Sequence, residues 1–100
     1  MNVEIIDGKA LKAVPVKNLF SYLENKGWVK RDTDFEAFSI WHNKPPRGKL
    51  AEILAPGRND YLDYAARVQE CIKAFAFVED RSQLFIYKDL MGDAYVPLGI

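Results

Sequence analysis

His42 is the only histidine in the chain, and it ends an aromatic-rich segment, "FEAFSIWH", at residues 35–42. An imidazole exchanges protons near neutral pH and could act as a general base, for example in the cleavage of RNA. The chain has no second histidine for a proton relay, and no pair of carboxylates has a spacing that indicates catalysis. We therefore place RNA cleavage through His42 third among the functions considered. We expect the histidine to face solvent or to cover a tryptophan.

The other side chains that could do chemistry lack the partners that the chemistry requires. Cys71 is the single cysteine, which excludes an internal disulfide, and its apolar neighbours in the sequence predict a buried residue. A structural zinc site normally takes four ligands, which one histidine and one distant cysteine do not supply. No serine lies in a nucleophile-elbow motif, and there is no glycine-rich phosphate loop. The sequence therefore predicts no catalytic residue, no metal and no cofactor.

Acidic and basic residues balance, since 14 Lys and Arg against 14 Asp and Glu give a formal charge of zero. A nucleic-acid-binding protein usually has a basic excess, because neutralising phosphates provides much of its affinity. A local basic group does surround the Pro45-Pro46 loop and the segment after the first long helix: Lys30, Arg31, Lys44, Arg47 and Lys49. Acidic residues at 32, 34, 36 and 52 weaken the field of this group. Nucleic-acid binding is therefore the alternative function.

The composition is that of one globular domain. The chain has 100 residues, of which 49% are apolar and 28% are charged, close to the averages for globular domains. No apolar run approaches the roughly 20 residues that a membrane-spanning helix needs. The first ten residues lack the features of a signal peptide. We expect a single cytoplasmic α+β domain over 1–100, with its core at 15–92, and no membrane partner.

The first half of the chain predicts one helix and an antiparallel sheet. Apolar residues recur at helical spacing over 15–27, with Pro15 in the first turn and Gly27 as the C-cap. Strand-favouring segments follow at 28–32, 35–42 and 50–56, joined by a turn at 32–34 and the loop 43–49. Because both connections are short, we expect a three-stranded antiparallel meander. A short strand at 3–6, ended by a turn at Asp7-Gly8, precedes the helix.

The second half predicts two helices. An apolar stripe extends from Tyr61 to Val78 after a capping residue at 59 or 60, and its unusual width indicates a helix with contacts on two sides. A short last helix follows a cap at Asp80 or Ser82 and stops at Gly92. The fold class is therefore α+β: helix, three-stranded antiparallel meander, long helix, short C-terminal helix.

The apolar residues of the C-terminal region exceed what a small fold easily covers, which indicates an interface. Aromatic residues and methionine dominate such contacts. The predicted anchors are Phe77, Leu84, Phe85, Tyr87 and Met91. The expected partner is another protein or a second copy of the chain. The chain could also be the N-terminal module of a longer polypeptide, and otherwise the tail folds back over the sheet.

The order of elements and the motif "L..YL...GW" (Leu19, Tyr22, Leu23, Gly27, Trp28) resemble the αβββα fold of double-stranded-RNA-binding domains and HicA-type RNA-cleaving toxins. This resemblance covers about residues 15–79 and implies the architecture. The functional residues of those families do not carry over. The toxins' Gly-Ser-His segment is absent from the strands, and the second helix begins with the acidic "NDYLDYAAR" in place of a lysine cluster.

A second resemblance is to the front segments of uncharacterised bacterial proteins, some linked to phage defence. It lies in the motifs "YL...GW", "P......DYA.R" and "E.RS" at residues 22–28, 56–67 and 79–82. The leading hypothesis is thus a non-catalytic interaction or assembly domain of a bacterial cytoplasmic protein, linked to phage defence. Its contact surface would be the apolar C-terminal helix.

Overall fold

The computed structural model describes residues 7–31, 37–46 and 48–92. Four helices and three strands follow one another as α1 (Gly8–Lys12), α2 (Val16–Asn25), β1 (Val29–Lys30), β2 (Phe38–Asn43), β3 (Ala51–Pro56), α3 (Tyr64–Glu79) and α4 (Gln83–Met91). This confirms the predicted α+β class and the order of helix, strands, long helix and short helix. The strand expected at 3–6 and the turn expected at 32–34 lie outside the described residues.

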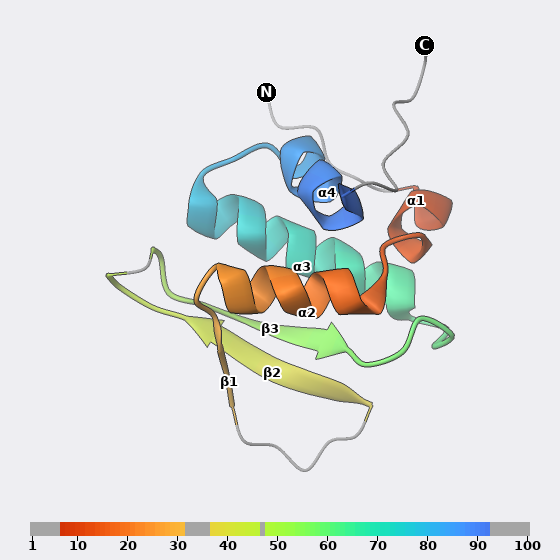
Figure 1. Ribbon diagram of the computed structural model, residues 1–100, viewed down its shortest axis with the longest axis horizontal. Coiled ribbons are helices and arrows are strands. Elements are labelled where there is room, and N and C mark those ends of the chain that lie inside the picture. Colours follow the sequence, from red (N-terminus) through yellow and green to blue (C-terminus); the bar gives the residue numbers. More distant parts are fainter. Residues whose placement is uncertain (1–6, 32–36, 47, 93–100) are drawn as a thin grey trace.

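The three strands form one antiparallel sheet in the order β1-β2-β3, as the sequence predicts. Val29 pairs with His42 and His42 with Glu52, so these residues form a row across the sheet. The pairing of the first two strands continues past β1, because the Arg31 amide donates to the Ile40 carbonyl (2.8 Å). All helices lie on one side of the sheet, so the described helices leave its other face uncovered (Figure 1).

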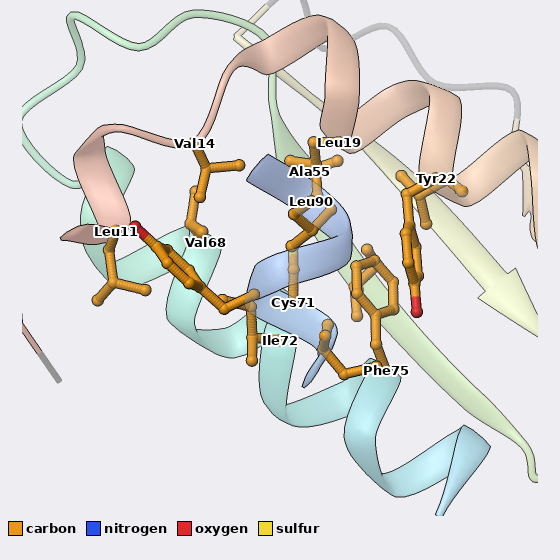
Figure 2. Close-up of a cluster of buried hydrophobic side chains, with 14 of the residues drawn as sticks. Leu11, Val14, Leu19, Tyr22, Ala55, Val68, Cys71, Ile72, Phe75 and Leu90 are labelled. Carbon is orange, nitrogen blue, oxygen red and sulfur yellow. The ribbon is translucent and has the colours of Figure 1, made fainter. Parts of the chain in front are cut away.

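α3 lies at the centre of the molecule, with contacts to β3 on one side and to α1 and α4 on the other (Figure 1). This explains the wide apolar side of the predicted helix. Its five buried residues are Tyr64, Val68, Cys71, Ile72 and Phe75. The Phe75 ring packs against Tyr22 of α2 (4.8 Å between centroids) and edge-on against Trp28 (5.4 Å). Figure 2 shows side chains from α1, α2, β3 and α4 meeting those of α3 in this cluster.

The end of α2 follows the rules that its sequence indicates. Gly27 has φ 82°, a left-handed conformation that glycine adopts without a steric penalty. The amides of Gly27 and Trp28 donate to Glu24 and Leu23, so they close the last helical turn. The chain then reverses into β1 with Trp28 buried. The glycine therefore sets the angle between α2 and the sheet.

Two expected boundaries are wrong. The Asp7-Gly8 pair does not form the expected turn but begins α1, where the Asp7 carboxylate accepts from the Lys9 amide (2.9 Å) as an N-cap. Neither residue 59 nor 60 caps α3, because the chain makes turns up to Asp63, which is the N-cap. Turn-forming residues and helix caps are the same residue types, so sequence alone did not separate them.

The start of α4 resolves a choice between two caps. The Ser82 hydroxyl accepts from the Leu84 amide (3.2 Å) and caps α4. Asp80 instead ends α3 in a left-handed conformation, with φ 54°. Gly92 follows α4 as its C-cap, as predicted.

Cys71 is fully buried, and its Sγ donates to the Leu54 carbonyl (3.6 Å). Burial raises the pKa of the thiol to about 12, so the reactive thiolate is suppressed at neutral pH. This confirms the prediction of a buried cysteine. In the described parts of the chain, no cluster of His, Cys, Asp and Glu could hold a metal ion, and no helix is long and apolar enough to cross a membrane.

Candidate functional sites

Three of the five predicted interface residues are exposed where α3 passes into α4. The exposed fractions are 54% for Phe77, 37% for Leu84 and 53% for Phe85. Phe77 lies in the last turn of α3, and the other two lie in the first turn of α4. We call these three residues the α3–α4 corner.

The other two predicted anchors, Tyr87 and Met91, are buried, with exposed fractions of 8% and 7%. They lie on the face of α4 that packs into the protein, together with Ile86 and Leu90. The Tyr87 hydroxyl donates to the Ala10 carbonyl of α1 (3.0 Å). As surface anchors they are therefore wrong. The sequence did not reveal this, because the burial of this face depends on how α4 packs against α3 and α2, and on α1, which was not predicted.

A groove of about 310 Å³ lies beside Phe77. Its lining residues come from the loop before β3, the end of α3 and the start of α4: Lys49, Lys73, Ala76, Phe77, Asp80, Arg81, Ser82 and Gln83. The Lys49 ammonium lies 4.5 Å from the centre of the Phe77 ring. A lysine of the predicted basic group and an aromatic residue of the predicted interface therefore meet at one place.

The loop that carries Lys49 is fixed to the end of α3. The Asn43 side chain donates to the Lys49 carbonyl (3.1 Å). Gly48 has φ 122°, and a Cβ at this position would lie 2.9 Å from Val78 Cγ1. Only glycine permits this approach without a shift of the loop or of Val78. Lys49 is thus held in place by the fold.

Charges of both signs surround the groove. Arg81 donates to Glu79 (3.0 Å) and to Asp89 (2.8 Å), and its hydrogen bonds to Asp89 and Glu79 raise the pKa of the guanidinium. Glu79 also accepts from the Tyr22 hydroxyl and lies 3.6 Å from Lys26. Since Arg81 is already paired with two carboxylates, the groove does not present a uniformly positive surface.

The predicted nucleic-acid-binding residues are not gathered in one patch. Lys30 lies on the edge strand β1, and Arg31 follows it and forms an ion pair with Glu52 (2.7 Å). Lys44 lies beside the Pro-Pro loop, and Lys49 lies over Phe77. Arg47 lies outside the described residues. The four described cations therefore divide between the sheet and the end of α3.

Arg31, His42 and Glu52 lie together on the uncovered face of the sheet. His42 is the direct cross-strand partner of Glu52, and directly opposed residues have Cβ atoms about 4.5–5.5 Å apart. The Arg31–Glu52 ion pair joins the first and third strands and so crosses the middle strand beside His42. Both partners are about half exposed, so the pair contributes at most about 1 kcal/mol to stability. Glu52 was missed as a site residue, because the predicted loop at 43–49 places residue 42 opposite residue 50, whereas the observed register places it opposite Glu52.

His42 is half-buried and pairs with both neighbouring strands. Side chains alternate along a strand, so His42 points away from the face that buries Trp41 and does not cover it. Its Nδ1 is buried and has no hydrogen-bond partner among the described residues. It lines a cavity of about 120 Å³ together with Gly27, Val29, Asn43, Lys44, Pro45 and Pro46.

Comparison with protein families, with curated proteins and with solved structures finds no match. The resemblances to double-stranded-RNA-binding domains, HicA-type toxins and phage-defence-linked proteins therefore remain sequence-based predictions. The function has to be argued from the two sites themselves.

Proposed function

We propose that this protein is a non-catalytic interaction domain that binds another polypeptide, or a second copy of itself, through the α3–α4 corner. The observation that carries the proposal is the exposure of Phe77, Leu84 and Phe85 around one helix–helix junction. Large apolar side chains that gather on a surface are typical of interfaces.

The chemistry of the α3–α4 corner favours a protein partner over a nucleic acid. Lys49 lies over the Phe77 ring and Lys88 over the Phe85 ring, 5.7 Å from its centre. Carboxylates at Glu79 and Asp89 accompany the nearby Arg81. An interface core of aromatic side chains with a mixed-charge rim is typical of protein–protein contacts. Burying the remaining exposed half of each ring would contribute about 1 kcal/mol or more.

The sequence resemblance adds a biological setting to the proposal. Motifs shared with bacterial proteins linked to phage defence support a role as a cytoplasmic assembly module of a bacterial protein. In such a module the sheet and α2 would provide the scaffold, and the α3–α4 corner would provide the contact.

Light scattering after size-exclusion chromatography tests self-association across a wide concentration range. The test variant is Phe77→Ser combined with Phe85→Ser, and Leu62→Ser is the matched control, since Leu62 is fully exposed just before the other end of α3. A second partner is sought by placing a photo-crosslinking amino acid at position 85 or at position 62 in the native host. Self-association that only the double variant abolishes supports the proposal, as does crosslinking restricted to position 85. A monomer at every concentration with no crosslink specific to position 85 refutes it.

Nucleic-acid binding is the second candidate, because Lys49 and the exposed Phe77 could contact a phosphate and a stacked base at one place. It predicts binding that weakens steeply with salt and that Lys49→Gln reduces. A complete absence of RNA or DNA binding at low salt removes this candidate. RNA cleavage through His42 is the third candidate, and cleavage that is unchanged in His42→Ala removes it.

A further inference from the structure

The uncovered face of the sheet carries a second group of functional side chains, separate from the α3–α4 corner. This group consists of Arg31, which directly follows β1, His42 of β2 and Glu52 of β3. The strand register places them beside one another. Lys44 follows β2 directly and lines the same cavity as His42. A guanidinium paired with a carboxylate thus lies on one side of His42 along the sheet, and an ammonium lies beside the cavity on its other side.

The cavity beside His42 has a size and a lining that suit a small anionic group. Its volume of about 120 Å³ accommodates several waters or one tetrahedral anion. Val29, Pro45 and Pro46 provide apolar walls, which strengthen electrostatic attraction by excluding water. Lys44 provides a positive charge at the same place. These residues form a partly enclosed site with a cation at its wall.

Two groups at this site have bonding capacity that a ligand would use. His42 Nδ1 is buried and has no hydrogen-bond partner among the described residues, which is unusual for a buried polar atom. Arg31 is bonded to Glu52, but both partners are about half exposed, and exposed ion pairs are weak. A stronger anion could therefore displace Glu52 from the guanidinium. Phosphate binds arginine through two parallel hydrogen bonds, which favours this exchange.

We propose that the uncovered sheet face binds the phosphate group of a small ligand, an inorganic phosphate or a phosphate monoester, between Arg31, His42 and Lys44. Glu52 occupies Arg31 in the free protein and is displaced when the ligand binds. This site is independent of the α3–α4 corner, so either proposal can fail alone.

The single histidine makes the test specific. Long-range proton–nitrogen NMR spectra of the full chain report the His42 ring nitrogens directly, because no other histidine contributes a signal. Inorganic phosphate, a phosphate monoester such as phenyl phosphate and a short RNA are titrated separately. Sodium chloride at equal ionic strength is the control. The proposal predicts a saturable shift of the His42 ring signals with phosphate or the monoester, and none with chloride.

Variants identify the groups that hold the anion. Arg31→Gln and Lys44→Gln should each weaken binding about five- to tenfold, because each removes a cation that contacts the phosphate. Glu52→Gln should strengthen binding at least threefold, because it removes the competing carboxylate. Lys12→Gln, at an exposed position of α1 away from both sites, is the matched control and should leave the affinity unchanged. Circular dichroism verifies that each variant is folded.

Four results would overturn the proposal. The His42 signals could stay unmoved by phosphate and by the monoester, or move equally with chloride. They could respond to RNA alone, which would indicate a nucleic-acid surface in place of a small-ligand site. Weaker binding in Glu52→Gln would also contradict it, since the carboxylate would then support the ligand.

Discussion

Glu79 joins three helices at the point where α3 ends, and replacing it with glutamine tests how much this junction stabilises the fold. Its carboxylate accepts from the Tyr22 hydroxyl of α2 at 2.5 Å and from Arg81 at 3.0 Å, and Arg81 binds Asp89 of α4. The Glu79 side chain is only 15% exposed, so water screens these contacts weakly.

The expected loss follows from these contacts. A hydrogen bond to a charged group contributes about 1.5–3 kcal/mol, and a neutral one contributes about half as much. Glu79→Gln keeps the shape of the side chain but removes its charge, and only one oxygen then remains to accept from Tyr22 and Arg81. We expect the free energy of unfolding to fall by about 2 kcal/mol. In a domain of this size the melting temperature then falls by about 8–16 °C.

Urea denaturation followed by tryptophan fluorescence measures this loss, since Trp28 and Trp41 are both buried. Glu70→Gln is the control, because Glu70 pairs with Arg67 at the exposed surface and should cost less than about 0.5 kcal/mol. Tyr22→Phe completes a double-mutant cycle with Glu79→Gln, with an expected coupling energy of about 1 kcal/mol. An effect of Glu79→Gln no larger than that of Glu70→Gln would show that this junction does not stabilise the fold.

Three further predictions concern two backbone positions and the buried side chains of Cys71 and Tyr64. Gly48→Ala should lower the free energy of unfolding by about 2 kcal/mol in urea denaturation, because the new Cβ meets Val78 and the backbone at φ 122° suits glycine. An unchanged urea midpoint would contradict the close packing of this loop against Val78. Asp80→Gly should stabilise by about 0.5–1 kcal/mol in the same assay, because Asp80 is left-handed at φ 54°, and a loss of stability would show that its side chain makes a larger contribution. The free energy of unfolding should fall as the pH rises above about 9. Burial raises the pKa of Cys71 and of Tyr64 to about 12, so the unfolded chain releases these protons at a lower pH than the folded protein does. The free energy of unfolding then falls by about 1.4 kcal/mol per pH unit for each of the two groups. Urea midpoints at pH 8, 9.5 and 10.5 measure this fall, which should be smaller in Cys71→Ala; equal slopes in the two proteins would contradict the buried thiol.

The sequence alone determined the elements whose signals are local. Gly27 ends a helix because of its backbone freedom, and this requirement is visible without knowledge of the rest of the chain. Short connections between strand-favouring segments implied an antiparallel meander, and the wide apolar side of α3 implied contacts on two sides. The burial of Cys71 also followed from its apolar neighbours.

Tertiary structure decided what depends on contacts between distant segments. Whether Tyr87 is an exposed anchor or a core residue depends on how α4 packs against α3 and α2, and on a hydrogen bond to Ala10 of α1, 77 positions earlier in the chain. The meeting of Lys49 with Phe77 depends on the close approach of Gly48 to Val78. The grouping of Arg31, His42 and Glu52 on one face depends on strand register, and a shift of one residue would place a side chain on the opposite face. Local secondary-structure propensity does not distinguish between alternative contacts of distant segments. The burial of a common hydrophobic core selects the arrangement that forms.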